Sequence, residues 1–304
     1  MTITELLQQS THQLQHAGIP SASLDTEVLL AHVLRTERSF ILAHGDTEVV
    51  ADKEKLFHSL LAKRLTRVPV AHLIGHKEFF ALDFIVSKDV LIPRPETETL
   101  IEHVLEYINE LSEMPAIIDV GTGSGAIALA LASRLPEAKI TALDSSEKAL
   151  AIALRNAEHL DLSTRVELLK SNLLSQLSTS HFLPPTSYII IANLPYLSPM
   201  DYAEALVDCP EIAFEPRGAL LGGDTGLEII EALLKQIKRI FTNKSAAIFL
   251  EIGMRQGDDI RTFTQNLFPK AHTEIMQDLS GRDRFAKILH QWTPKTEKPA
   301  AQGR

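Results

Sequence analysis

The tetrapeptide Asn193-Leu194-Pro195-Tyr196 directly follows an apolar stretch, residues 188–192, that has the composition of a buried strand. A planar amide or amine nitrogen is a poor nucleophile, because its lone pair is delocalised into the neighbouring π-system. The side-chain oxygen of Asn193 and the carbonyl oxygen of Leu194 could accept both of its N–H groups and aim the lone pair at an electrophilic carbon. Tyr196 offers a flat wall for the planar group. The tetrapeptide thus indicates chemistry at a planar nitrogen.

A glycine-rich loop stands at a predicted strand-to-helix turn. Its residues are Gly121, Thr122, Gly123, Ser124 and Gly125. Glycines let the backbone turn sharply and let a ligand approach closely, and the free N–H groups that begin the next helix can meet an anion. Asp144 ends the following predicted strand, where its carboxylate could accept hydrogen bonds from two ribose hydroxyls. The loop and this acid predict a nucleotide-like cofactor.

The glycine loop alone leaves the cofactor open between S-adenosylmethionine and NAD. Gly121, Gly123 and Ala126 also fit the dinucleotide fingerprint, with an acid about 20 residues on. Asp119 and Gly125 favour S-adenosylmethionine, since an acid in the preceding strand could meet the ligand's amino group directly or through water. Neither residue is decisive. The tetrapeptide by itself also fits a strand that ends in a proline turn, and its place in the same sheet favours a functional site.

Strands and helices alternate from residue 116 onward, which indicates a mostly parallel sheet with helices on both faces. Strands are expected at residues 116–120, 139–143, 166–169, 188–192 and 246–252, and an antiparallel pair at 272–277 and 284–289. Helices are expected at residues 124–135, 147–160 and 227–241. Ligands of such sheets bind at the carboxyl ends of the strands. Both motifs lie there.

The chain before residue 93 has a different character. Residues 1–74 show only the helical spacing of apolar side chains, which predicts a small helical domain. Residues 75–92 contain two short strands around a turn, which predicts a β-hairpin connector. The methyl-transfer and cofactor motifs fall within residues 93–292, a third unit, and residues 293–304 have the composition of a disordered tail.

Composition narrows the function classes. The formal net charge of −9 argues against a nucleic acid partner, because domains that grip duplexes carry basic surfaces. The single cysteine, Cys209, excludes an internal disulfide and fits a reducing compartment. The N-terminus lacks the features of a signal peptide, and the apolar runs are too short to span a bilayer. We expect a cytoplasmic protein with no membrane association.

Two further groups of residues were weighed for chemistry. His72 and His76 stand four residues apart but straddle Gly75 and have no matching acid or thiol partners nearby, so no metal site is expected. Arg94 lies between two prolines, and it either orients a ligand or forms a salt bridge with Glu96 or Glu98. The two interpretations of Arg94 carry equal weight.

Together the motifs resemble the HemK/PrmC family, the glutamine N5-methyltransferases that modify peptide chain release factors. The resemblance runs from the helical domain to about residue 290. The stretches that carry it are Gly75-His76-Lys77-Glu78-Phe79, residues 91–98 (Leu-Ile-Pro-Arg-Pro-Glu-Thr-Glu), residues 119–125, Asp144-Ser145-Ser146, Glu215-Pro216, residues 219–223 and Glu251-Ile252-Gly253. Residues 91–98 are the most specific to the family, because many methyltransferases share the glycine loop.

The resemblance implies a Rossmann-like class I methyltransferase domain with a seven-stranded, mostly parallel sheet, preceded by a helical domain that docks the release factor. It implies transfer of a methyl group from S-adenosylmethionine to the glutamine of the Gly-Gly-Gln loop. Asn193, which would also meet the cofactor, and the main chain after it would hold the glutamine amide. Asp144 would hold the cofactor ribose, and Asn172 and Leu173 would lie at the adenine. We expect release factors as partners, no direct nucleic acid and a monomer.

Two positions depart from the family pattern. Leu194 replaces the first proline of Asn-Pro-Pro-Tyr, which keeps the carbonyl acceptor but loses the fixed φ, and Asn172 replaces an aspartate.

Asn-Leu-Pro-Tyr is the form found in ribosomal RNA adenine dimethyltransferases, so an adenine N6-methyltransferase acting on RNA or DNA is the alternative. The acidic charge and the position of the helical domain argue against it. An NAD-dependent oxidoreductase lacks a catalytic pair, and a non-catalytic scaffold stays open.

Overall fold

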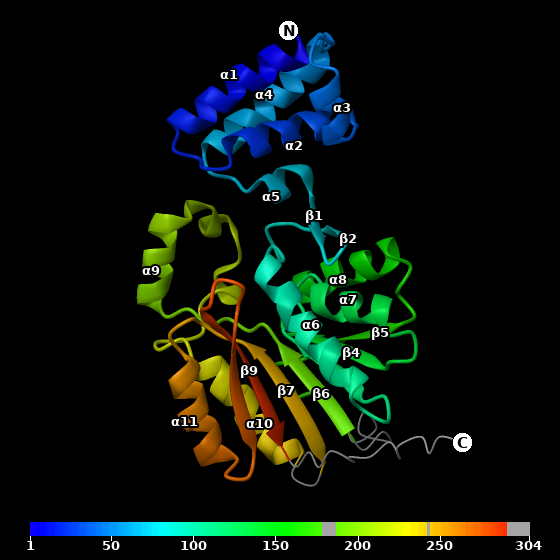
Figure 1. The fold of residues 1–304 in the computed structure, drawn as a ribbon, viewed down its shortest axis with the longest axis vertical. Helices are drawn as coiled ribbons and strands as arrows, with labels where there is room; N and C mark the ends of the chain where they lie inside the picture. The colour runs from blue at the N-terminus through cyan, green and yellow to red at the C-terminus, as the bar shows by residue number, and fades with distance from the viewer. Residues whose placement is uncertain (178–186, 242–243, 291–304) are drawn as a thin grey trace, which may run out of the picture.

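The computed structural model describes residues 1–177, 187–241 and 244–290. Figure 1 shows a bundle of helices at one end, a hairpin in the middle and a larger domain, built on a twisted sheet, at the other end. The expected tail, residues 293–304, lies outside the described residues. Within the described part of the chain, no helix has both the length and the apolar character needed to cross a bilayer.

The N-terminal bundle is helical throughout, as its apolar spacing predicts. Its helices are α1 (Ile3–His16), α2 (Ala22–Leu34), α3 (Arg38–Ala43), α4 (Ala51–Leu65) and α5 (Val70–Ile74). Helix α1 begins with a capping box, in which the Thr2 hydroxyl accepts the N–H of Glu5 and the Glu5 carboxylate accepts the N–H of Thr2. The apolar faces of the helices form one core of their own.

A buried ion-pair cluster joins this bundle to the sheet domain. Arg64, 4% exposed, donates from Nε to Asp25 at 2.7 Å and from Nη1 to Glu211 at 2.8 Å. Glu211 belongs to η2 (Pro210–Phe214), a short helix of the sheet domain, and Arg67 also reaches it at 3.5 Å. The two carboxylates accept hydrogen bonds from different nitrogens of the buried guanidinium and balance its charge. The cluster therefore ties the two domains together through Glu211, which lies far from the hairpin in the sequence.

The connector is the expected hairpin, β1 (His76–Phe79) paired antiparallel with β2 (Leu82–Ile85). Its two-residue turn places Phe80 at φ 52° and Ala81 at φ 58°. Two left-handed residues make a type I′ turn, which matches the twist of the strands but normally uses asparagine or glycine. Glu98 accepts the N–H of Phe80 at 2.9 Å, and Arg134 lies over the Phe80 ring. Contacts from the sheet domain thus hold a turn that its own residues disfavour.

We expect Ala81→Gly to stabilise the protein. A left-handed alanine costs about 1 kcal/mol that glycine does not incur, and part of this gain is offset by the greater freedom of glycine in the unfolded chain. Urea unfolding should therefore show a rise of up to about 1 kcal/mol in the free energy of unfolding. Ala203→Gly, at an exposed position inside helix α9 (Pro199–Asp208), is the matched control and should lower it by about the same amount.

The sheet has seven strands in the order β5-β4-β3-β6-β7-β9-β8. The strands are β3 (Ala116–Val120), β4 (Ile140–Asp144), β5 (Val166–Lys170), β6 (Ser187–Ala192), β7 (Ser245–Glu251), β8 (His272–Gln277) and β9 (Asp283–His290). All neighbours are parallel except β9, which runs antiparallel to both β7 and β8. The chain leaves β3 toward one edge and returns at β6 toward the other. That reversal creates a crevice at the carboxyl ends of β3 and β6.

Helices cover both faces of this sheet, because consecutive residues of the central strands are apolar and point alternately to the two faces. In β6, Ile189 and Ile191 face one core, while Tyr188 and Ile190 face the other. The first core is closed by α6 (Pro95–Asn109), α7 (Ala126–Arg134) and α8 (Glu147–His159), and the second by α10 (Glu228–Ile240) and α11 (Gly257–Leu267). The predicted seven-stranded Rossmann-like architecture is confirmed. Helices α9 and α11 were not predicted from the sequence.

Candidate active site

A cavity of about 540 Å³ lies at the crevice between β3 and β6. The glycine loop reaches it from β3, Asp144 from β4 and the tetrapeptide from β6. Of the residues proposed from the sequence, those that line the cavity are Gly121, Thr122, Gly123, Ser124, Asp144, Asn172, Leu173, Asn193, Leu194 and Pro195. Gly125 and Tyr196 do not line it. The topology thus brings together nearly all of the residues chosen for their chemistry.

The glycine loop needs its glycines for two different reasons. Gly121, Gly123 and Gly125 all have left-handed backbones, at φ 77°, 56° and 83°. Gly125 caps the start of α7, and a Cβ there would lie 3.0 Å from Leu129 and 3.3 Å from Ala153, so it is closely packed. A Cβ on Gly123 would meet no atom within 4 Å. Gly123 lines the cavity and leaves its backbone open to a ligand.

Asp144 is fixed by the backbone around it. Its Oδ2 accepts the N–H of Gly123 at 2.9 Å, and its Oδ1 accepts the N–H of Ser146 at 2.8 Å. Each carboxylate oxygen has a second lone pair for a ligand. The side chain therefore lies in the cavity wall with its orientation set and with free acceptor capacity, as holding a diol requires.

Asp119 lies behind the glycine loop and does not line the cavity. It is fully buried, and its Oδ2 accepts the Thr122 hydroxyl at 2.6 Å and the N–H of Ala128 at 3.2 Å. Its Oδ1 is buried with no partner among the described residues. Burial raises the pKa of Asp119 to about 7, opposed by the bond from Thr122. Asp119 thus supports the loop and puts a titratable group behind the lining of the cavity.

The segment after β5 forms another part of the cavity wall. Asn172 and Leu173 both line it, and Leu173 has a left-handed backbone with φ 53°. The Ser171 hydroxyl donates to the carbonyl of Leu173 at 2.6 Å, and Gln236 of α10 accepts the N–H of Leu174 at 2.8 Å. These bonds hold an unusual turn in place. The turn presents the Asn172 side chain at the edge of the cavity.

The Asn193 amide is held in one orientation by a buried carboxylate. Its Nδ2 donates to Glu251 Oε2 at 2.9 Å and to the Thr97 hydroxyl at 3.1 Å. A carboxylate ion can only accept hydrogen bonds, so the Asn193 side chain must turn its nitrogen, the donor, toward Glu251. The Oδ1 of Asn193 then faces away from Glu251. Among the described residues, nothing donates to this oxygen or to the carbonyl oxygen of Leu194.

Glu251 itself is fixed by three donors, one from α6 and two from the tetrapeptide. It is 2% exposed at the end of β7, and Thr97 of α6 donates its hydroxyl to Oε2 at 2.7 Å. Tyr196 donates its hydroxyl to Oε1 at 3.3 Å, and burial raises the pKa of Tyr196 above its ordinary value, so it stays a neutral donor. Burial also raises the pKa of Glu251, and the bond from Thr97 opposes that shift. Tyr196 therefore braces Glu251 from behind the cavity.

The sequence analysis did not assign a role to Glu251 or Thr97. Both lie in stretches that it singled out, residues 91–98 and Glu251-Ile252-Gly253. A signal was available for Glu251, since an acid that ends a strand of otherwise apolar residues is unusual unless it has partners. No comparable signal marks Thr97, because its partner is 154 residues away.

Leu194 replaces proline without opening the loop. Its side chain is 5% exposed and packs in the core beneath the sheet's carboxyl ends. A Cβ on Gly121 would lie 2.8 Å from Leu194 Cδ2, so the tetrapeptide and the glycine loop are packed against each other. Packing thus restrains the residue that lacks the fixed φ of proline.

Arg94 does not form the salt bridge with Glu96 or Glu98 that was weighed from the sequence. It pairs with Glu215, which is 4% exposed and also accepts the N–H of Ile92 at 2.9 Å. The local salt bridge was wrong because the partner of Arg94 is 121 residues away in the sequence. The other alternative, that Arg94 orients a ligand, stays a prediction. Arg94 lines the cavity, so its guanidinium is held at the wall by a carboxylate behind it.

The remaining stretches singled out in the sequence surround the tetrapeptide. Leu197 donates its N–H to the carbonyl of Leu220 at 3.0 Å, and Gly222 donates to the carbonyl of Leu197 at 2.9 Å. Gln256 donates to the carbonyl of Tyr196 at 2.9 Å and accepts the N–H of Gly253 at 2.8 Å. Backbone pairing on one side and Gln256 on the other therefore fix the path of the chain after Asn193.

Two models of known families match the chain. One, described as the PrmC N-terminal domain, matches residues 5–75, and the other, described as the methyltransferase small domain, matches residues 96–221. The two matches fall on either side of the hairpin connector and together cover most of the chain.

Relatives match over nearly the full length. The release factor glutamine methyltransferase of Rhodopirellula baltica is 36% identical over 94% of this chain and 96% of its own. That of Escherichia coli is 37% identical over 84% of this chain and 87% of its own. A crystal structure of the hMettl16 catalytic domain with an RNA hairpin shares the fold, at a TM-score of 0.57 and 16% identity over 79% of this chain and 84% of that one. The chain therefore belongs to the PrmC/HemK family of release factor glutamine methyltransferases.

Proposed function

We propose that this enzyme transfers a methyl group from S-adenosylmethionine to the side-chain amide nitrogen of the glutamine in the Gly-Gly-Gln loop of peptide chain release factors. One observation carries the proposal most directly. The Asn193 amide is locked with its nitrogen on Glu251, and this leaves its oxygen and the carbonyl of Leu194 as free acceptors at the cavity. A primary amide has two N–H groups, and two free acceptors match it in number.

The residues of the cavity fit S-adenosylmethionine. The open backbone at Gly123 suits close approach of the ligand, and the partly free carboxylate of Asp144 suits its ribose hydroxyls. Asn172 and Leu173 line the cavity, where we expect them to meet the adenine, and Asp119 in its ionised form would put negative charge under a ligand that carries an ammonium and a sulfonium. The bound cofactor would supply an activated methyl group.

The protein's own contribution is orientation. With both N–H groups of the glutamine amide accepted by Asn193 and Leu194, the nitrogen lone pair stands perpendicular to the amide plane and faces the cofactor side of the cavity. The acceptors also draw the N–H protons away from nitrogen, which raises its electron density. We propose residues 1–74 as the docking domain for the release factor, residues 75–92 as its connector and residues 93–292 as the catalytic domain.

The test is to incubate the untagged protein with labelled S-adenosylmethionine and a release factor, and to map the product by mass spectrometry. One added methyl group on the Gly-Gly-Gln glutamine is expected. A release factor with alanine in place of that glutamine is the matched control and should take up no label. Label on nucleic acid alone, or on another residue of the release factor, would contradict the proposal.

Cofactor affinity should depend on pH through Asp119. Its pKa of about 7 means that it loses its proton as the pH rises through neutrality. A cationic ligand above it favours the ionised form, so binding of S-adenosylmethionine should weaken by up to about tenfold for each pH unit below 7. Isothermal titration calorimetry from pH 6 to pH 8 measures this.

Two comparisons isolate the contribution of Asp119. Asp119→Asn keeps an acceptor for Thr122 but cannot ionise, so it should remove most of the pH dependence. S-adenosylhomocysteine lacks the sulfonium charge and should show a smaller dependence in the unaltered protein. An unchanged pH profile in Asp119→Asn would assign the effect to another group.

A further inference from the structure

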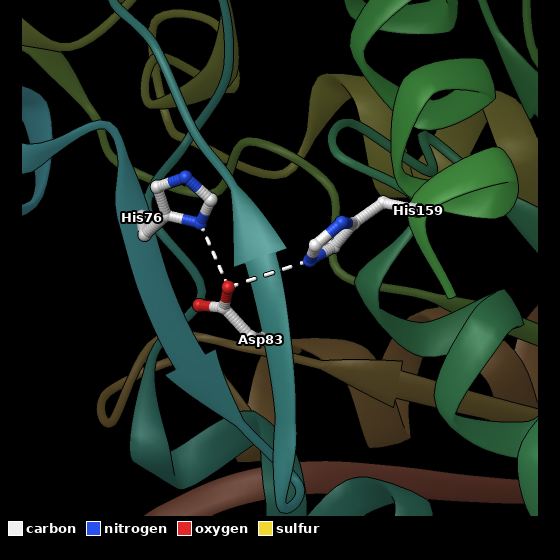
Figure 2. A group of neighbouring side chains, drawn as sticks. All are labelled: His76, Asp83 and His159. Atoms are coloured by element: carbon white, nitrogen blue, oxygen red, sulfur yellow. Dashed lines mark hydrogen bonds and ion pairs between the residues drawn. The ribbon is translucent and has the colours of Figure 1, made fainter.

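His76, Asp83 and His159 form a cluster on the surface (Figure 2), and none of the three lines the active-site cavity. The Oδ2 of Asp83 lies 2.8 Å from Nδ1 of His76 and 3.4 Å from Nε2 of His159. Figure 2 shows the two imidazoles approaching the carboxylate from opposite sides, one from the hairpin and one from a helix. Three ligand atoms thus meet within 4.8 Å of one another. No metal site was expected from the sequence, because His159 lies far from His76 and Asp83 along the chain.

The hairpin register puts two of the ligands on one face. Glu78 pairs with Asp83 and His76 pairs with Ile85, so the side chains of His76 and Asp83 are diagonal neighbours on the same side of the ribbon. Diagonal neighbours are close enough for an imidazole and a carboxylate to share an ion. The backbone alone therefore sets this half of the cluster.

Asn156 fixes the third ligand relative to the other two. Its Oδ1 accepts the N–H of Ile85 at 2.7 Å and its Nδ2 donates to the carbonyl of Ile85 at 3.0 Å, so α8 is bound to strand β2. Asn156 is fully buried, and His159 follows it by nearly one helical turn. Val86 and Val90 pack against Ala149 of α8 on the same side. The three ligands stand on elements that are already joined.

We propose that His76, Asp83 and His159 bind a divalent transition-metal ion of the Zn²⁺ class. Two imidazoles and one carboxylate are the donors that Zn²⁺ accepts, with water in the fourth tetrahedral position. Bonds of about 2.1 Å in a tetrahedron place ligand atoms about 3.4 Å apart. The distance between Asp83 and His159 has this value, and His76 would move outward by about 0.6 Å from its present hydrogen bond. Exposed side chains, at 44%, 54% and 41%, have the freedom to make that adjustment.

The bound ion would fasten the hairpin connector to the catalytic domain. Its ligands come from β1, β2 and α8, which meet where the helical domain joins the sheet domain. Asn156 also donates from Nδ2 to the carbonyl of Ser124 at 2.9 Å, so the same helix supports the glycine loop. An ion at this point would restrain the direction in which the helical domain extends from the cavity.

Metal binding to the untagged, chelator-treated protein tests the proposal. Titration calorimetry with ZnCl₂ should give about one ion per chain, and CoCl₂ should give the visible absorption of a tetrahedral site. At a hundredfold excess over the dissociation constant, Zn²⁺ should raise the thermal midpoint by about 5 °C. His159→Gln and Asp83→Asn should each weaken Zn²⁺ binding by at least about tenfold and remove the thermal shift.

A second histidine pair supplies the matched control. His12 and His16 of α1 lie side by side, with ring centroids 4.0 Å apart, and could hold an ion on their own. His16→Gln should leave the stoichiometry and the affinity unchanged. The proposal is overturned if His16→Gln abolishes binding, or if the two cluster variants bind Zn²⁺ as the unaltered protein does. It is also overturned if no Zn²⁺ binds at a metal concentration of about 100 μM, because a three-ligand site should have a lower dissociation constant.

Discussion

Asn193→Ala should lower the rate of methyl transfer by about 10²–10³-fold, the effect of removing one preorganised hydrogen-bonding group from an active site. The substitution removes the oxygen that would accept one N–H of the glutamine amide. The glutamine amide then keeps only its hydrogen bond to the carbonyl of Leu194. Rotation about this one hydrogen bond takes the nitrogen lone pair out of line with the methyl group. Single-turnover kinetics with a release factor measure the loss. Affinity for S-adenosylmethionine should change by less than about tenfold, because Gly123 and Asp144 are untouched.

Asn193→Asp distinguishes the loss of an acceptor from the loss of orientation. Aspartate supplies an oxygen toward the cavity, but its other oxygen would face the carboxylate of Glu251 at the 2.9 Å now spanned by a hydrogen bond. Two carboxylates at that distance repel or must share a proton. We expect the variant to be nearly as slow as Asn193→Ala at neutral pH. Full activity in Asn193→Asp would show that the oxygen alone suffices and that its orientation by Glu251 is unimportant.

The parts of the fold that the sequence predicted are those set by local patterning. Apolar runs such as residues 188–192 mark central strands, and their side chains alternate between two cores as a buried parallel sheet requires. Because parallel strands place their carboxyl ends at one edge, residues that follow different strands, such as Gly121 and Asn193, could be assigned to one site in advance. The cavity contains both.

The contacts that make the site work could not be predicted, because they join distant segments through single side chains. Arg94 pairs with Glu215 and not with Glu96 or Glu98, the two acids within four residues of it. Thr97 and Glu251 likewise meet across 154 residues. Spacing along the chain carries no information on such pairs. Helix α9 was missed although Ser198 and Asp201 form a capping box at its start, and among its residues only Tyr202 is buried.

These distant contacts explain why the stretch at residues 91–98 and the acid at residue 251 belong together. Pro95 starts α6, which presents Thr97 toward the end of β7, and Arg94 at the same turn holds Glu215. One short segment therefore braces both the acid that orients Asn193 and the segment that follows the tetrapeptide. The catalytic geometry depends on α6 although α6 contributes no acceptor to the substrate.

Glu251→Leu should lower kcat by about 10²-fold, the cost of misplacing a reacting group by about 1 Å. Leucine cannot accept from Asn193, so the amide becomes free to rotate and to present its nitrogen, a donor, to the N–H groups of the substrate. The side chain is 2% exposed, and its loss also leaves the hydroxyls of Thr97 and Tyr196 without their acceptor. Calorimetry should show unchanged binding of S-adenosylmethionine. The effect should appear in kcat rather than in cofactor affinity.

Glu251→Gln separates positioning from charge. Its amide oxygen can take the place of Oε2 and accept from Asn193 and Thr97, while its nitrogen faces the hydroxyl oxygen of Tyr196. If Glu251 acts by fixing the Asn193 amide, the glutamine variant keeps its activity to within about tenfold, since only the extra strength of charge-assisted bonds is lost. Thr97→Val removes one donor to Glu251, and its activity should lie between those of Glu251→Gln and Glu251→Leu. Equal losses in Glu251→Gln and Glu251→Leu would instead mean that the negative charge itself assists transfer, because the glutamine preserves every acceptor that Asn193 needs.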